Sequence, residues 1–211
     1  MKVLITAGPT REAIDAVRFL SNRSTGKMGY ALAHAAVERG LEVVLISGPV
    51  SLPAVSGARM VFVESAAEMA AAVRENIDGC GVVVMAAAVA DYRPKTRFAG
   101  KLKKGEGGLT LELERTEDIL AALGKGKQPG QKLVGFAAET DNVEHNAQEK
   151  LKRKNLDFIA ANDVSRPGCG FAGDTNCVTL YCADGAKYDI PFGSKAEVAV
   201  EMWKIIMGDV Q

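Results

Sequence analysis

Short runs of apolar residues, most of them followed by small or turn-forming residues, recur along the chain. They occupy residues 2–6, 42–46, 60–63, 82–88, 133–137 and 158–161. Short continuous apolar runs are typical of strands that are buried on both faces of a sheet. Because helical patterns separate the runs, the sequence predicts an α/β, Rossmann-like fold, in which helices cover both faces of a mainly parallel sheet.

Apolar residues at helical spacing, together with capping residues, mark the helices. Gly40 follows the first helix at the position of a carboxyl cap. The pairs Ser65 with Glu68 and Ser194 with Glu197 match capping boxes, which begin helices. The predicted helices cover residues 26–39, 65–77 and 117–123, a segment opened by Asp141 with Glu144, and a final segment after Ser194.

Two other parts of the chain alternate polar and apolar residues, as half-exposed antiparallel strands do. They are residues 109–113 and the pair formed by residues 177–181 and 188–191. We expect them to form a small antiparallel extension that makes a dimer contact. The 211 residues are 47% hydrophobic and contain no linker-like segment, so a single domain over residues 1–211 is expected.

Composition narrows the partners and the compartment. Lysine and arginine together number 26, as do aspartate and glutamate, so no net field draws the molecule to nucleic acid or to an anionic membrane. The apolar runs are shorter than the roughly 20 residues that span a bilayer, and no signal-peptide pattern is present, so a cytoplasmic protein is expected. The four cysteines form no C-x-x-C pair, and we expect reduced structural thiols and no metal site.

Ligands bind beyond the carboxyl ends of the strands in open parallel sheets, and the first such end here is rich in small residues. Gly8 follows the first strand, and residues 22–29 lead into a helix whose free N–H groups can accept an anion. Serine, threonine and glycine also begin helices for purely structural reasons. Met28 follows Gly26-Lys27 where a Walker A loop has serine or threonine, and no G-x-G-x-x-G spacing is present, which disfavours P-loop nucleotidases and dehydrogenases.

The second strand end, residues 85–94, combines small side chains with Asp91. A flat base or a ribose can approach such a backbone closely, although a strand that ends in a solvated aspartate has the same sequence. Residues 95–108 follow and carry Lys101, Lys103 and Lys104 among glycines, without apolar periodicity. We interpret this segment as a mobile cationic loop that can close over phosphates, or as a solvated surface loop.

The third strand end, residues 135–140, contains Phe136, which can stack on a base or a ribose. The helix that follows carries Lys150 and Lys154, which are four residues apart and share one face. Lysines are also common at helix carboxyl ends because they complement the helix dipole.

Several stretches together resemble the successive motifs of the bacterial phosphopantothenoylcysteine synthetases. They read TAGPTREAIDAVRFLSNRSTGKMG, AAAVADYRP, KLKK, GFAAET, KLKRKNLDFIAANDV and GSKAEVA, and they span nearly the whole chain. The resemblance implies a nucleotide-binding ligase of coenzyme A biosynthesis that joins phosphopantothenate to L-cysteine. In this family CTP activates the carboxylate as an acyl-cytidylate, CMP and pyrophosphate are released, and Mg²⁺ accompanies the nucleotide without an assigned protein ligand.

The resemblance also implies roles for individual residues. It implies that Asn22 and Lys101 are catalytic. The implied CTP-binding residues are Met85, Ala86, Ala87, Asp91, Lys101, Glu117, Asp118, Ile119, Leu120, Phe136, Lys150 and Lys154. The implied phosphopantothenate-binding residues are Gly8, Asn22, Ser24, Gly26 and Asn162.

One departure from the family affects the nucleotide site. Many bacterial members have an Asn-Pro-Asp-Ile run where this chain has Thr116-Glu117-Asp118-Ile119, so side-chain contacts there are in question. The resemblance also implies a homodimer and a flavin-dependent decarboxylase that is fused to the synthetase or separate from it. Two rival functions are a nicotinamide-dependent reductase on the same fold and a non-catalytic nucleotide-sensing module.

Overall fold

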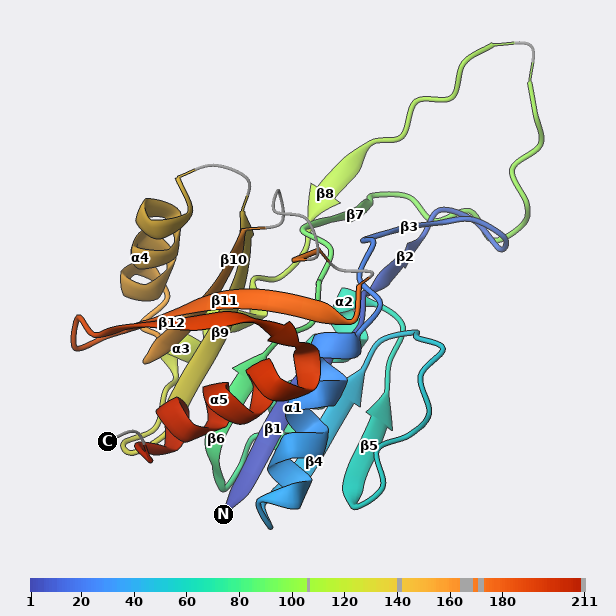
Figure 1. Cartoon of the computed structure of the whole chain (residues 1–211). Helices are drawn as coiled ribbons and strands as arrows, with labels where there is room; N and C mark the ends of the chain where they lie inside the picture. The colour runs from blue at the N-terminus through green and yellow to red at the C-terminus, as the bar shows by residue number, and fades with distance from the viewer. Residues whose placement is uncertain (106, 140–141, 164–168, 171–172, 210–211) are drawn as a thin grey trace.

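The largest element of the fold is a twisted sheet built from strands that lie far apart in the sequence (Figure 1). The computed structural model describes residues 1–105, 107–139, 142–163, 169–170 and 173–209. Within these residues the main sheet has eight strands in the order β12-β11-β10-β9-β6-β1-β4-β5. Their bounds are β1 (Lys2–Ala7), β4 (Glu42–Ser47), β5 (Ala58–Phe62), β6 (Cys80–Met85), β9 (Lys132–Glu139), β10 (Phe158–Asp163), β11 (Thr175–Cys182) and β12 (Lys187–Ser194).

The strand order reverses beside β1. The chain goes from β1 to β4 on one side, whereas β6, β9 and β10 extend the sheet on the other side, all of them parallel to β1. Connections therefore leave β1 and β6 in opposite directions, which opens a crevice beyond their carboxyl ends. A parallel bridge between Pro9 and Ala88 continues the contact of β1 with β6 past the strands themselves.

Five helices of the described residues cover the two faces of the sheet (Figure 1). Helices α1 (Lys27–Glu38) and α5 (Lys195–Met207) share one core with Val3 and Ile5 of β1. Helices α2 (Ala66–Asn76), α3 (Ile119–Lys125) and α4 (Val143–Arg153) share the other core with Leu4. Successive residues of β1 thus face opposite cores, which explains its continuous apolar sequence. No helix within the described ranges is both long and apolar enough to cross a membrane.

The predicted parallel α/β fold with helices on both faces is confirmed, and the boundaries differ by a few residues. Both capping boxes are present, with the side chains of Ser65 and Ser194 accepting from the backbone N–H of Glu68 and Glu197. Residues 86–88 were expected to continue β6 but lie beyond its end. The opening residue expected for α4, Asp141, lies outside the described residues, and the helix begins at Val143.

The predicted antiparallel strands are confirmed, although they lie at two different places in the fold. Residues 177–181 and 188–191 belong to β11 and β12, which add antiparallel strands to the edge of the main sheet. Of residues 109–113 only Leu113 is in a strand, β8 (Leu113–Arg115), which pairs with β7 (Tyr92–Pro94). An unpredicted hairpin of β2 (Arg11–Ala13) and β3 (Phe19–Ser21) lies next to β7 beyond the main sheet (Figure 1).

Helix α1 begins in close contact with the end of β1. A Cβ added to Gly26 would lie 3.3 Å from the Cα of Gly8, and one added to Gly29 would lie 2.5 Å from the Cβ of Ala7. Gly26 also has a φ of 78°, which disfavours other residues. The motif that resembles a phosphate-binding loop therefore has a packing function, because it lets the helix backbone reach the strand.

Replacing Gly29 with alanine tests this close packing. Alanine is the better helix former by about 1 kcal/mol, yet its methyl group would overlap Ala7, and overpacking costs about 1–3 kcal/mol. We expect Gly29→Ala to lower the free energy of unfolding by about 1 kcal/mol in denaturant titrations, the difference between the two effects. Gly100→Ala is the matched control, because an added Cβ there has nothing within 4 Å. A Gly29→Ala variant more stable than the parent would contradict the close contact.

Candidate functional site

A cavity of about 600 Å³ lies beyond the carboxyl ends of β1, β6 and β9, where the strand order reverses. This volume is typical of small-molecule sites. It brings together residues from the start of α1, the loop after β6, the start of α3 and the last turns of α4. The predicted site residues that line it are Asn22, Ser24, Gly26, Met85, Ala86, Ala87, Asp91, Glu117, Asp118, Ile119, Leu120, Phe136, Lys150, Lys154 and Asn162.

Two predicted site residues, Gly8 and Lys101, are not among the lining residues. Gly8 lies behind the cavity wall, where an added Cβ would be 3.0 Å from a methyl carbon of Val50 and 3.1 Å from the carbonyl oxygen of Gly48. Its small size is therefore required by packing at the end of β1. Lys101 is exposed on the long loop between β7 and β8.

The loop that carries Lys101 is anchored to the turn between β2 and β3. The backbone N–H of Leu102 donates to Oδ2 of Asp15 at 3.1 Å, and Nη2 of Arg18 donates to the carbonyl oxygen of Leu102 at 3.0 Å. Phe98 N–H donates to the carbonyl oxygen of Ile14 at 3.0 Å. The Arg18 side chain and the N–H of Val17 hold the pKa of Asp15 well below its usual range, so this anchor is charged at neutral pH.

The loop after β6 is held by polar side chains on the β1 side of the cavity. Nδ2 of Asn22 donates to the carbonyl oxygens of Ala88 and Val89, at 3.0 and 3.3 Å. The hydroxyls of Thr6 and Thr10 accept from the backbone N–H groups of Ala87 and Ala90. These contacts fix the backbone that the sequence predicted to lie against a base or a ribose. They also place the predicted catalytic Asn22 at the junction of both strand ends.

Asp118 and Lys154 form an ion pair on the α3–α4 side of the cavity. Asp118 caps α3 by accepting from the N–H of Ala121, and Nζ of Lys154 donates to its Oδ1 at 2.9 Å. Burial raises the pKa of Asp118, but the hydrogen bonds from Lys154 and Ala121 outweigh it, and the net pKa is lowered. Lys154 therefore joins the end of α4 to the start of α3 in addition to facing the cavity.

Thr116 and Glu117, where the chain departs from the family motif, use their side chains for contacts with a neighbouring loop and with helix α2. The hydroxyl of Thr116 donates to the carbonyl oxygen of Ala90 at 2.5 Å. The carboxylate of Glu117 accepts from Arg74 of α2, with both of its oxygens 2.9 Å from Nη1. Both residues line the cavity, but these contacts direct their polar atoms to other parts of the protein.

The sequence prediction missed a second group of lining residues at the start of α5 and β11. It includes Lys195, which is 6% exposed and donates to the carbonyl oxygens of Gly170 and Gly173 at 3.4 and 2.5 Å. Burial lowers the pKa of Lys195. A lysine in the first turn of a helix opposes the helix dipole, and this was the available signal. The other lining residues were not named individually as site residues, although most lie in the strand-end segments 22–29, 85–94 and 135–140. They are Arg23, Thr25, Lys27, Met28, Gly29, Ala88, Val89, Ala90, Thr116, Ala137, Ala138, Ile159, Gly170 and Asn176.

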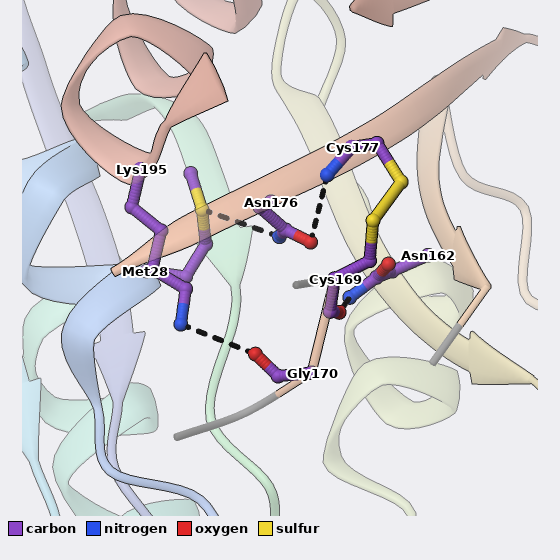
Figure 2. Close-up of a disulfide and its surroundings, with 7 residues drawn as sticks. All are labelled: Met28, Asn162, Cys169, Gly170, Asn176, Cys177 and Lys195. Atoms are coloured by element: carbon purple, nitrogen blue, oxygen red, sulfur yellow. Dashed lines mark hydrogen bonds between the residues drawn. A yellow bond between two sulfur atoms is a disulfide. The ribbon is translucent and has the colours of Figure 1, made fainter. Parts of the chain in front are cut away.

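The expectation that all four cysteines are reduced is wrong for two of them. Cys169 and Cys177 form a disulfide with Cα atoms 5.6 Å apart (Figure 2). Their spacing gave no sign of this contact, which arises because β11 runs back antiparallel beside β10. Cys80 and Cys182 are free and buried, as expected. Among the described residues no group of three or more histidine, cysteine, aspartate or glutamate side chains is arranged to hold a metal.

The family of the chain follows from comparison with known proteins. The model of the DNA/pantothenate metabolism flavoprotein C-terminal domain matches residues 1–209. The chain belongs to this family. It is 57% identical over 201 residues to the coenzyme A biosynthesis bifunctional protein CoaBC of Bacillus subtilis, and 47% identical over 206 residues to that of Vibrio vulnificus strain CMCP6. These matches cover 95% and 97% of this chain but 49% and 51% of the relatives, so the chain spans about half their length.

Solved structures agree with this family membership. A crystal structure of the C-terminal domain of a CoaBC protein superposes with a TM-score of 0.84 and 46% identity, covering 99% of this chain and 96% of that one. The DNA/pantothenate metabolism flavoprotein of Streptococcus pneumoniae has a TM-score of 0.82 at 22% identity, with full coverage of both chains. The second likeness shows that the fold is retained at low sequence identity.

The anchor of the long loop can be tested with Asp15→Asn. In Asp15, Oδ2 accepts hydrogen bonds from both Arg18 and Leu102. The substitution puts an NH₂ group in place of one carboxylate oxygen, and an NH₂ group accepts no hydrogen bond. Because the pKa of Asp15 is depressed, its contribution is present at neutral pH and is lost only as the pH falls through the folded-state pKa. We expect trypsin at neutral pH to cleave after Lys101, Lys103 and Lys104 at least about threefold faster than in the parent.

Glu112→Gln is the matched control for the loop anchor. It removes an exposed ion pair with Lys95 on the same loop and leaves the Asp15 contacts in place, so cleavage is expected to change little. Equal cleavage rates in Asp15→Asn and the parent would show that Leu102 is not held by Asp15.

Proposed function

We propose that the chain is a phosphopantothenate–cysteine ligase of coenzyme A biosynthesis, which uses CTP and proceeds through an acyl-cytidylate. The proposal rests on the 57% identity to a coenzyme A biosynthesis protein, together with a cavity lined by nearly all the residues that the resemblance implied. The CTP preference rests on the resemblance alone.

The cavity has two ends that suit two ligands. One end has the aromatic Phe136 and the lysines Lys150 and Lys154, a set suited to a nucleoside triphosphate. The other end is formed by the amino terminus of α1, where backbone N–H groups favour an anion, and by Lys195. In this arrangement the phosphate of phosphopantothenate binds at α1, and its carboxylate extends toward the nucleotide.

The reaction requires that the carboxylate first be made reactive toward an amine. A carboxylate oxygen attacks the α-phosphorus of CTP and pyrophosphate leaves. The amine of cysteine then attacks the acyl carbon, loses a proton, and CMP leaves with the bonding electrons. Excluding water protects the anhydride between the steps. Asn22, held at the junction of the strand ends, is suited to orient the acyl-cytidylate. Lys101 does not line the cavity, so it reaches the intermediate only when its loop closes or when the loop of a partner subunit provides the lysine.

Mg²⁺ fits this site as a companion of the nucleotide. The described residues offer no cluster of three or more typical metal-ligating side chains, whereas Asp91 lines the cavity and is suited to add one oxygen ligand. A bound Mg²⁺ supplies positive charge to the triphosphate. Lys150 and Lys154 then add to the neutralisation of charge on the leaving pyrophosphate.

The proposed partners extend beyond the substrates. Exposed apolar side chains gather on the β2–β3 hairpin, the β7–β8 ribbon and the loop between β7 and β8, which suits a homodimer contact. They are Val17, Phe19, Tyr92, Phe98, Leu109 and Leu113. The relatives are called bifunctional and are about twice as long, so a flavin-dependent decarboxylase, fused or separate, is the second proposed partner. The proposed compartment is the cytoplasm.

The overall reaction provides the first test of function. With CTP, phosphopantothenate, L-cysteine and Mg²⁺, we expect one pyrophosphate and one CMP per phosphopantothenoylcysteine, measured by coupled phosphate release and mass spectrometry. Omitting phosphopantothenate should abolish release. Absence of pyrophosphate under varied conditions, with thermal stabilisation by NADPH instead of CTP, would favour the rival reductase.

The nucleotide end of the cavity can be tested with Lys154→Gln. The change removes a cation next to the proposed triphosphate position and leaves the Asp118 carboxylate without its partner. Because a hydrogen bond to a charged group contributes about 1.5–3 kcal/mol, we expect KM for CTP to rise at least about tenfold. Lys152→Gln is the control, since Lys152 is exposed on the same helix and does not line the cavity. Equal KM values for the two variants would remove Lys154 from nucleotide binding.

A further inference from the structure

The Cys169–Cys177 disulfide lies directly behind one wall of the cavity, next to the lining residues Gly170 and Asn176 (Figure 2). It joins the segment that follows β10 to strand β11, which is fixed in the main sheet. Cys169 is 2% exposed, whereas Cys177 is partly exposed. Gly170, next to Cys169, lines the cavity, as does Asn176, next to Cys177. The covalent bond therefore connects two neighbouring parts of the same wall.

Hydrogen bonds connect each half of the disulfide to a lining asparagine. Nδ2 of Asn162 donates to the carbonyl oxygen of Cys169 at 2.6 Å, and Cys177 N–H donates to Oδ1 of Asn176 at 3.0 Å. The neighbouring Gly170 carbonyl accepts from Lys195. The carbonyl oxygens of Cys169 and Gly170 thus orient the side chains of Asn162 and Lys195, which both line the cavity (Figure 2).

Asn162 indicates that this wall faces a ligand. The residue is 9% exposed, and its Oδ1 is buried without a hydrogen-bond partner among the residues that the structure describes. Buried polar atoms are nearly always paired, and an exception at a cavity wall points to a missing donor. Because Nδ2 is committed to Cys169, Oδ1 is the atom that remains to accept an N–H or O–H group from a bound molecule.

We propose that Cys169 and Cys177 form a reversible thiol–disulfide modification site that controls how tightly the cavity binds its acid substrate. The identity of that substrate, phosphopantothenate, rests on the proposed function. In the oxidised form the Cys169–Gly170 segment is held on β11, and the Asn162 amide and the Lys195 ammonium are oriented before binding. In the reduced form the segment is no longer bonded to β11. Part of the binding free energy is then used to order the segment and the two side chains, which weakens binding.

The reductant is a dithiol, and the exchange is balanced. Its thiolate attacks Sγ of the partly exposed Cys177, the S–S bond breaks, and the electron pair goes to Sγ of Cys169, which takes a proton from solvent. The second thiol of the reductant then loses its proton and attacks the reductant sulfur that is bonded to Cys177. This breaks the mixed disulfide and releases the Cys177 thiolate, which takes up a proton. The reductant leaves as a disulfide, and the protein keeps two thiols.

The two remaining cysteines do not compete in this exchange. Cys80 and Cys182 are buried and free, and burial raises the pKa of both thiols, that of Cys182 to about 11. Thiols of this kind are poor nucleophiles at neutral pH. Their positions provide a matched control for substitution.

The test compares oxidised, reduced and reoxidised protein. Peptide mapping without reductant should show Cys169 linked to Cys177, and calorimetric titration with phosphopantothenate should give a Kd about five- to tenfold higher after reduction, restored on reoxidation. Cys169→Ala/Cys177→Ala should match the reduced protein in both conditions. Cys182→Ala should keep the full redox response. An equal Kd for linked and reduced protein, or failure of the linkage to form under mild oxidation, would overturn the proposal.

A second measurement separates this proposal from the function on which it rests. Amide hydrogen exchange at Gly170 and Asn176 without ligand should be faster after reduction, whether or not the protein binds phosphopantothenate. Unchanged exchange at both amides rejects the redox site. Accelerated exchange with no phosphopantothenate binding and no pyrophosphate release would reject the proposed ligase and the stated ligand, while the redox control of the wall would stand.

Discussion

The contact between the first turn of α1 and the end of β1 is the constraint on which the cavity depends. It requires that Gly26 and Gly29 have no side chain, because added Cβ atoms would meet the backbone of Gly8 and the side chain of Ala7. With the helix this close, the segment before it reaches the carboxyl end of β6, where Asn22 binds the loop backbone. Helix α5 packs along α1, and the indole N–H of Trp203 donates to the carbonyl oxygen of Leu32. This packing brings the amino terminus of α5 to the same edge of the sheet.

The parallel core could be predicted because its strands and helices carry strong local patterns. Buried apolar runs, helical spacing and capping boxes all depend on neighbours within a few residues. The β2–β3 hairpin was missed because three-residue strands are too short to show alternation. The alternation at residues 177–181 and 188–191 correctly indicated antiparallel strands, but a local pattern does not say which sheet they join. In the structure β11 pairs with β10, and Val178 and Leu180 bury their side chains in the α1–α5 core.

The same distinction between local and distant information applies to the site. The strand-end rule and the family resemblance found residues close to β1, β6 and β9, because the end of each strand is readable from its own sequence. Lys195 and Asn176 reach the cavity from the far end of the chain through the packing of α5 and β11, which no local pattern encodes. Gly8 does not line the cavity, and packing at the end of β1 requires its small size. The contact of Cys169 with Cys177 likewise depends on the path of β11, and their spacing in the sequence could not reveal it.

The lysines of the cavity show how a chain with no net charge can still bind anions. Lys154 pairs with Asp118 and Lys27 pairs with Asp174, so two of the cations are already compensated before a ligand arrives. The carboxylates are the solvent-facing partners, with side chains 52% and 86% exposed against 16% and 32% for the lysines. An incoming phosphate can therefore take over a lysine while water resolvates the released carboxylate, and exposed pairs of this kind lose little when they exchange partners. The pairs hold the lysines in position without preventing the transfer of their charge to a ligand.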